Sequence, residues 1–132
     1  MDFLRPYAPQ LLSILRIMSG LIVVEHATAK YLNFPTSPMN NMNPMTMNGA
    51  AGIVEAIFGT LLVIGLFTRF SAFILSGLCA VAYFYAHAPR GLFFPLLNGG
   101  ELAVVLTFVY LYVAAAGPGP WSVDRAISGS NT

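Results

Sequence analysis

The sequence predicts an all-α membrane protein, a four-transmembrane-helix bundle with both termini in the cytoplasm. Of its 132 residues, 57% are hydrophobic and only 8% are charged, whereas about a quarter of a soluble domain is charged. The mean hydropathy is +0.73. The apolar residues form four runs, each close to the roughly 20 residues that a transmembrane helix needs. Because four spans use most of the chain, residues 1–132 are expected to form a single transmembrane domain.

The first two spans are predicted over residues 10–33 and 49–67. Pro9 precedes the first run and an Asn-Phe-Pro segment at 33–35 ends it, since proline fits the first turn of a helix but not its interior. Residues 34–48 are rich in proline, asparagine and methionine, which predicts an extracytoplasmic loop between the two spans.

The third and fourth spans are predicted over residues 70–88 and 99–116. Pro89 is expected to close the third span, and a Gly-Pro-Gly-Pro segment at 117–120 to close the fourth. Within hydrocarbon each backbone N–H and C=O must bond inside its own segment, so all four spans are expected to be helices.

Basic residues predict the orientation of the bundle. An even number of spans places both termini on one side, and arginine and lysine favour the cytoplasmic side. The two groups of basic residues are Arg5, Arg16, Arg69 and Arg125 on the side of the termini, and Lys30 and Arg90 on the other. The bias predicts cytoplasmic termini. The balanced composition, with a net charge of +1, excludes a nucleic-acid-binding protein.

The opposite, extracytoplasmic end gathers most of the ionisable side chains. A charge inside a bilayer costs roughly 2.5–3.5 kcal/mol on insertion scales, so such groups are functional or tightly paired. The residues expected at this end are Glu25, His26, Lys30, Glu55, His87, Arg90, Asn98 and Glu101. With both histidines neutral, their formal charges sum to −1, which is close to the balance that mutual pairing would give.

Helical spacing predicts which of these side chains face the bundle. Glu55 lies between Gly52 and Gly59, and such small residues let a neighbouring helix come close, so Glu55 is predicted to point inward. In each of the other three spans, a set of residues lies along one face of the helix. These sets are Arg16, Ser19, Val23, His26 and Lys30; Cys79, Tyr83 and His87; and Glu101, Val105, Phe108 and Tyr112. Glu25 lies off the first stripe and is expected to meet another neighbour or the lipid headgroups.

Two interpretations of the polar cluster remain open. In the first, a pocket binds a quinone ring, a lipid headgroup or a proton, and its candidate lining is His26, Lys30, Glu55, His87, Asn98 and Glu101. A histidine beside carboxylates titrates near neutral pH and can exchange protons with a quinol. In the second, the same groups pair with one another and fix the register of the bundle.

A resident metal is not expected. The Glu-x-x-His pattern of di-iron bundles is absent, and the single cysteine, Cys79, excludes an internal disulfide or a Cys-x-x-Cys pair. Four methionines of the predicted loop are candidate Cu(I) ligands, because thioethers are soft donors: Met39, Met42, Met45 and Met47. Without a histidine or cysteine beside them, we favour an adaptable apolar surface that touches lipid or a partner.

Several short elements resemble those of the DoxX family of small four-helix membrane proteins. They are Gly-Leu-Phe-Thr-Arg at 65–69, Asn-Gly-Gly-Glu at 98–101 and Gly-Pro-Gly-Pro-Trp-Ser-Val-Asp at 117–124, together with His26 and Lys30. The resemblance covers about residues 10–125. One departure is Ala27, where the family often has glycine, so the close helix approach implied there is relaxed.

The resemblance implies a link to membrane redox chemistry. The family is associated with membrane oxidoreductases, notably a thiosulfate:quinone oxidoreductase, and with redox-homeostasis assemblies, although many members have no assigned activity. The fold also resembles that of the vitamin K epoxide reductase group, whose dithiol this chain lacks. We therefore expect an integral subunit of a quinone-linked redox complex in the cell membrane, not catalytic alone, with membrane lipids and other subunits as partners.

No haem pair, flavin motif or iron–sulfur cysteine pattern occurs in the sequence. We therefore expect no intrinsic cofactor, only bound quinone or lipid, and electrons supplied by another polypeptide. Three alternatives remain: a structural subunit whose cluster is closed and paired, a lipid- or small-molecule-binding protein whose pocket opens to the bilayer, and a copper-handling protein that uses its methionines.

Overall fold

A computed structural model describes residues 1–36, 38, 43–91 and 94–128, and every regular element within them is helical. Three stretches of this described part are long and apolar enough to cross a membrane: Asp2–Tyr31, Met47–Ile64 and Thr68–Arg90. A fourth helix, Glu101–Ala116, is apolar but shorter. The prediction of an all-α protein of the membrane type is therefore confirmed.

The elements follow one another along the chain as short and long helices. In order they are η1 (Asp2–Tyr7, a 3₁₀-helix), α1 (Ala8–Tyr31), α2 (Met47–Ile64), α3 (Thr68–Ala82), η2 (Tyr83–His87, a π-helical turn), α4 (Ala88–Gly91), α5 (Pro95–Asn98), α6 (Glu101–Ala116) and α7 (Val123–Ser128).

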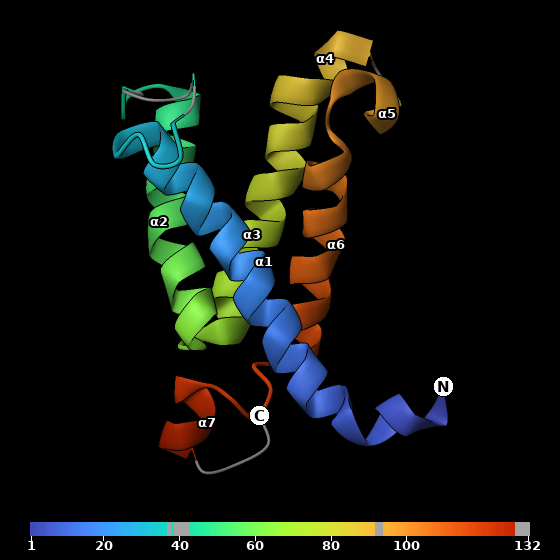
Figure 1. Ribbon diagram of the computed structural model, residues 1–132. Helices are drawn as coiled ribbons and strands as arrows, with labels where there is room; N and C mark the ends of the chain where they lie inside the picture. The colour runs from blue at the N-terminus through green and yellow to red at the C-terminus, as the bar shows by residue number, and fades with distance from the viewer. Residues whose placement is uncertain (37, 39–42, 92–93, 129–132) are drawn as a thin grey trace.

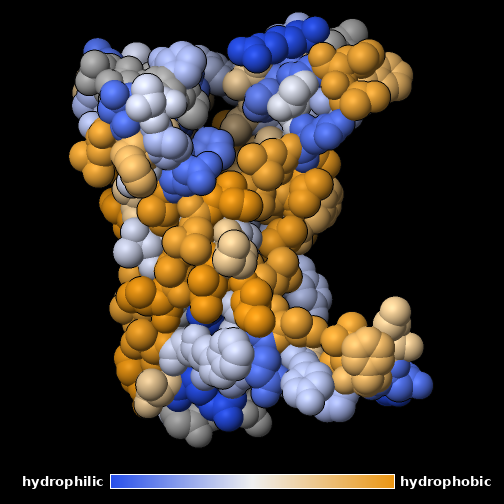
Figure 2. Space-filling model, in the orientation of Figure 1, coloured by the Kyte–Doolittle hydropathy of each residue, from blue (hydrophilic) through white to orange (hydrophobic). Residues whose placement is uncertain are grey.

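The four long helices form two antiparallel pairs (Figure 1). Helix α1 packs along α2, and α3 packs along α6. The two pairs approach each other at the end that carries the α2–α3 turn, α7 and the N-terminus, called here the closed end. They diverge toward the opposite end, called here the open end, which carries α4, α5 and the α1–α2 connection (Figure 1). Figure 2 shows a broad apolar band between two more hydrophilic ends, as a membrane protein requires.

The third long helix continues past the position at which it was predicted to end. Pro89 lies inside α4, and the helical stretch runs on to Arg90. The π-helical turn η2 precedes this proline, and the N–H of Ala88 bonds to the carbonyl of Tyr83, five residues earlier. Such a widened turn rearranges the backbone bonds next to a proline, so a transmembrane helix can pass through it.

Glycines set the close contact between α1 and α2. A Cβ atom at Gly20 would lie 2.9 Å from Val63 Cγ2, and one at Gly59 would lie 2.8 Å from Val23 Cγ2. Both distances are below van der Waals contact, so neither position accepts a side chain unless the helices separate. This is the packing by small residues that the sequence predicted for α2.

The buried core lies where the two helix pairs meet. Its members are Val23, Leu62, Ala72, Leu75, Cys79, Leu106, Tyr110 and Val113. The hydroxyl of Tyr110 donates a hydrogen bond to the carbonyl of Ser19 (2.6 Å), which joins α6 to α1 across this core. The hydroxyl of Ser76 donates to the carbonyl of Thr107 (2.7 Å), which joins α3 to α6. Val23, Cys79 and Leu106 also form part of the wall of a cavity on the open side of this core.

At the closed end, the fully buried Arg16 holds the segment that follows α6. Its guanidinium donates hydrogen bonds to the carbonyl oxygens of Pro118 and Trp121, the latter at 2.7 Å. It also reaches the carbonyl of Val63 at 3.4 Å. A buried guanidinium needs several acceptors, and here backbone carbonyls supply them. Arg16 therefore ties α1 to the end of α2 and to the glycine- and proline-rich segment.

Asp124 completes this closure by capping α3. Its carboxylate accepts hydrogen bonds from the N–H groups of Phe67 and Thr68, both at 2.9 Å. Its own N–H donates to the carbonyl of Gly65 at 2.8 Å. Gly65 adopts a left-handed conformation (φ 76°), and a Cβ there would meet Ser122. The segments 65–69 and 117–124 thus bind each other and have a structural role at the closed end.

Candidate ligand-binding site

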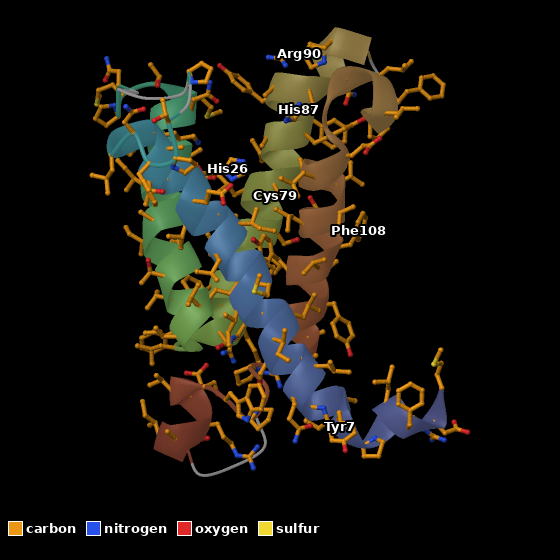
Figure 3. The ribbon with its side chains drawn as sticks, viewed as in Figure 1. Tyr7, His26, Cys79, His87, Arg90 and Phe108 are labelled. Carbon is orange, nitrogen blue, oxygen red and sulfur yellow. The ribbon has the colours of Figure 1, made fainter. Side chains whose placement is uncertain are left out.

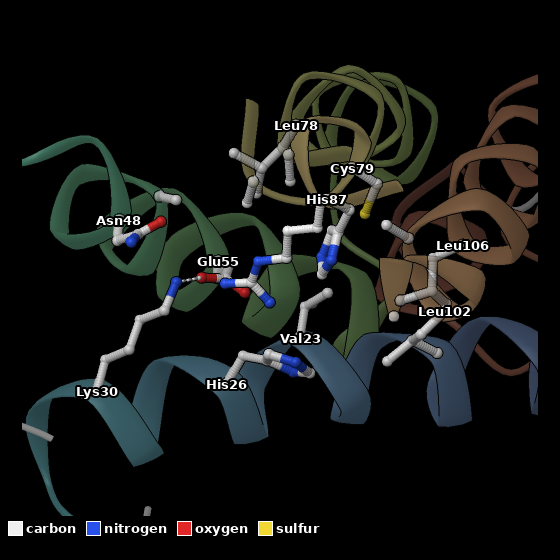
Figure 4. Close-up of a pocket in the computed structure, with 16 residues that line it drawn as sticks. Val23, His26, Lys30, Asn48, Glu55, Leu78, Cys79, His87, Leu102 and Leu106 are labelled. Atoms are coloured by element: carbon white, nitrogen blue, oxygen red, sulfur yellow. Dashed lines mark hydrogen bonds and ion pairs between the residues drawn. The ribbon is translucent and has the colours of Figure 1, made fainter. Parts of the chain in front are cut away.

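A cavity of about 440 Å³ lies between the two helix pairs on the side of the open end. Figure 2 shows the molecule hollowed there, with hydrophilic residues around the hollow. Helices α1, α2, α3 and α6 contribute to its wall, as do η2 and α4. Its polar lining residues are His26, Lys30, Asn48, Glu55, Cys79, His87 and Arg90. Figures 3 and 4 show that the side chains of His26, Cys79 and His87 point into the space between the helix pairs.

An ion pair joins α1 to α2 at one wall of the cavity. Lys30 Nζ lies 2.6 Å from Glu55 Oε1, and each residue is only 7% exposed. A Cβ at Gly52 would lie 3.0 Å from Lys30 Cδ, so the glycine makes room for the lysine side chain. The inward orientation predicted for Glu55 is therefore observed. An ammonium group has three N–H donors, which leaves Lys30 further donors beside the one that Glu55 accepts.

Backbone carbonyls orient both histidines. His26 Nδ1 lies 2.8 Å from the carbonyl of Ile22, and His87 Nδ1 lies 3.3 Å from the carbonyl of Asn98. A carbonyl only accepts, so each Nδ1 carries the hydrogen and each neutral ring has its lone pair on Nε2. Each Nε2 can therefore accept a proton from a ligand when neutral, or donate a hydrogen bond when protonated.

Asn98 does not line the cavity but supports it. The residue is 3% exposed, its amide donates to the hydroxyl of Tyr83 (3.1 Å), and its amide oxygen accepts from the N–H of Gly100 (2.9 Å). Its backbone carbonyl is the group that faces His87. Asn98 thus joins the start of α6 to η2 and positions His87.

Two of the predicted carboxylates lie outside the cavity. Glu25 and Glu101 are both exposed, and neither lines the wall. Glu101 begins the stripe that continues through Val105, Phe108 and Tyr112, and this whole stripe is exposed because α6 buries its opposite face. The charged lining is therefore Lys30, Arg90 and Glu55, a formal sum of +1 with neutral histidines, and not the −1 expected from the sequence.

A comparison with known protein families matches the part of the chain that contains α1, α2 and α3. The model of the DoxX family matches residues 11–88, more than half of the chain. This chain belongs to the DoxX family. A protein of Haemophilus influenzae described as uncharacterized is 42% identical over 131 residues, covering 95% of this chain and 96% of its relative. No solved structure matches. Together with its membrane-length helices, membership in DoxX makes this a multi-pass integral membrane protein.

The part that matches the DoxX model contains His26, Lys30, Glu55 and His87, the ionisable groups that converge from three elements. Arg90 follows directly and was not among the predicted pocket residues. The sequence places this arginine one helical turn after His87, on the same helix face. The prediction missed it because the helix was expected to end at Pro89.

The structure identifies no group of three or more histidine, cysteine or carboxylate side chains suited to a metal within the residues that it describes. Two of the four candidate copper ligands, Met39 and Met42, lie outside the described residues. Met45 is 90% exposed, and Met47 begins α2 beside a second hollow. The alternative of a copper site on these methionines of the DoxX protein stays a prediction.

Proposed function

We propose that this protein is a membrane subunit of a redox complex and that its cavity binds the ring of a quinone. The observation that supports this best is the pair of histidines, His26 and His87, each held at Nδ1 and each offering Nε2 at one cavity. The volume of the cavity lies in the range of about 300–1,000 Å³ that is usual for small-molecule sites.

The chemistry of a quinol suits these groups. Oxidation breaks the two O–H bonds of the quinol and releases two protons and two electrons. In the proposed reaction the neutral Nε2 atoms of His26 and His87 each accept one of the two protons, and both electrons pass to an electron-accepting partner subunit. In the reverse direction Lys30 and protonated histidines donate hydrogen bonds to the quinone carbonyl oxygens, where negative charge develops. His26 and His87 are the residues proposed to touch the substrate.

We further infer that α6 crosses the membrane as a fourth span and that both termini are cytoplasmic. Sixteen helical residues extend about 24 Å at 1.5 Å per residue, which is slightly short of the hydrocarbon thickness of roughly 30 Å. Helix α6 packs along α3, which belongs to the membrane-length helical stretch Thr68–Arg90. Arg5, Arg69 and Arg125 lie at the closed end, and the bias of basic residues makes that end cytoplasmic. The cavity then lies near the extracytoplasmic face.

The binding test uses the purified protein in nanodiscs and a soluble benzoquinone as the probe. Replacing His26 by Phe removes one hydrogen-bonding group and is expected to weaken binding about tenfold or more. His87→Phe should act in the same direction. The matched control is Phe108→His, which adds an imidazole on the exposed face of α6 and should leave binding unchanged. Equal affinity in all four proteins would refute the proposal.

A lipid phosphate is the second candidate ligand. The observation that favours it is the formal charge of +1 on the lining, to which Arg90 contributes. Mass spectrometry of the gently purified protein distinguishes the two ligands. A retained anionic phospholipid that is lost in Arg90→Gln would support the lipid, whereas a retained quinone would support the redox role.

A further inference from the structure

A second hollow of about 230 Å³ lies between α2 and α3, next to the polar cavity. Its lining is almost entirely apolar, with Asn48 and Tyr85 as the polar side chains. Several lining residues are exposed at the surface: Met47 is 51% exposed, Val81 is 53% exposed and Tyr85 is 56% exposed. The hollow is therefore a groove at the surface of the α2–α3 seam, toward the open end, and in the proposed topology its exposed side faces the bilayer.

The groove and the cavity share part of their walls. Asn48, Ala51, Leu78, Ala82 and Ala86 line both. Three of these five residues are alanines, whose side chain is a single methyl group, so the wall between the groove and the cavity is thin. A ligand in the cavity therefore lies directly beside the groove.

Two other seams between neighbouring helices, α1–α2 and α3–α6, are closed more tightly. Gly20 and Gly59 bring α1 and α2 into close contact. The hydrogen bond from Ser76 to the carbonyl of Thr107 fastens α3 to α6. Between α2 and α3 the contact is smaller, and the π-helical turn η2 lies on the same side as the groove. The α1–α6 seam has less direct contact still. The apolar hollow that adjoins the cavity nevertheless lies at the α2–α3 seam, so this seam is the lateral boundary with preformed space for an apolar group.

We propose that this groove holds the isoprenoid tail of the quinone whose ring occupies the cavity, and that the quinone enters from the bilayer between α2 and α3. The inference rests on the proposed function, because it needs a ring-binding cavity. A membrane quinone joins a polar ring to a long apolar chain, and the two adjoining hollows have the matching polar and apolar linings. Lipid chains are as apolar as the groove, so moving the isoprenoid tail from the bilayer into the groove gains no additional hydrophobic free energy. The groove therefore recognises the tail by its shape.

The test separates the tail from the ring. Two probes are used with the protein in nanodiscs: a tail-less benzoquinone and the same ring with a two-isoprene tail. Ala50→Trp and Val54→Phe enlarge residues that line the groove but not the cavity. Ala56→Trp is the control, because Ala56 is an exposed alanine of the same helix that lines neither hollow.

The expected result is that Ala50→Trp and Val54→Phe weaken the tailed quinone on the order of tenfold. Binding of the tail-less ring should stay within about twofold, as should binding of both probes to Ala56→Trp. Equal binding of the tailed probe to all four proteins would overturn the groove and leave the ring site intact. So would a phospholipid chain that stays in the groove and that the tailed quinone does not displace. If neither probe binds the unmodified protein, the proposed function fails, and this inference fails with it.

Discussion

At the residue scale, the Lys30–Glu55 pair is the strongest electrostatic contact that borders the cavity. Both groups are buried, and they connect α1 to α2 through one short contact of 2.6 Å. Taking two charges out of water is costly, so such a pair adds little net stability, but removing one partner leaves the other uncompensated.

Replacing Glu55 by Gln is therefore expected to lower the free energy of unfolding by about 3–5 kcal/mol. The double variant Lys30→Met/Glu55→Gln should recover most of that loss, because no buried charge remains. Glu101→Gln is the matched control, since this exposed carboxylate should change stability by no more than about 0.5 kcal/mol. Thermal unfolding in detergent measures all three. Equal losses in Glu55→Gln and Glu101→Gln would contradict the account of the ion pair.

At the scale of elements, glycines decide how closely the helices pack. Gly59 faces Val23 and Val24 of α1, whereas a Cβ at Gly77 of α3 would meet nothing within 4 Å. Both glycines lie inside helices, so replacing either one by alanine should raise helix propensity by the same amount. The difference between the two substitutions then isolates the effect of packing.

Gly59→Ala is expected to destabilise the protein by about 1–3 kcal/mol, because the new methyl group forces α1 away from α2. Gly77→Ala should instead stabilise it by about 0.5–1 kcal/mol through helix propensity. The two midpoints of thermal unfolding should shift in opposite directions. A shift of the same sign in both would show that close packing of α1 on α2 is not what requires Gly59.

The closed end supplies a second test at this scale. Asp124 caps α3 through two backbone N–H groups, and losing such a cap costs about 0.5–2 kcal/mol. Asp124→Ala is expected to lower stability by that amount without changing quinone affinity, because the cavity lies toward the opposite end of the bundle. Asp2→Ala is the control, since the side chain of Asp2 is exposed. A loss of quinone binding in Asp124→Ala that leaves stability intact would contradict this structural role.

Helical spacing predicted some features of the site and missed others for a physical reason. Glu55 was placed correctly because Gly52 and Gly59 mark the face of α2 that meets another helix. Glu101 was not, because α6 is apolar all around and its exposed stripe looks like a core stripe in the sequence. The continuation through Pro89 could not be predicted either, since no residue in the sequence announces a π-helical turn at Tyr83–His87.

At the scale of the whole molecule, two helix pairs meet at the closed end and diverge toward the cavity (Figure 1). The sequence predicted that polar groups from separate spans would gather near one end. The retained set is smaller than expected: the structure brings together His26, Lys30, Glu55 and His87, places Asn98 behind them and leaves Glu101 outside. Hydrogen bonds therefore hold the helices together at the closed end, whereas the open end contains a polar cavity.

The proposed topology is tested by single-cysteine labelling in intact cells. The native cysteine is first removed by the substitution Cys79→Ala, and one new cysteine is then introduced at a time. Ser122→Cys at the closed end should react with a membrane-impermeant maleimide only after the membrane is opened. Leu96→Cys at the opposite end, where Leu96 is 79% exposed, should react from outside. Labelling of both positions from the outside would contradict four spans with cytoplasmic termini.

Photolabelling with an azidoquinone, followed by mapping of the modified residues by mass spectrometry, tests the central claim most directly. The account predicts adducts on the cavity wall, near His26, Cys79 and His87, that excess unlabelled quinone suppresses. Adducts confined to the exposed stripe of Val105 and Phe108 on α6, or no competition by quinone, would contradict a quinone site in the cavity.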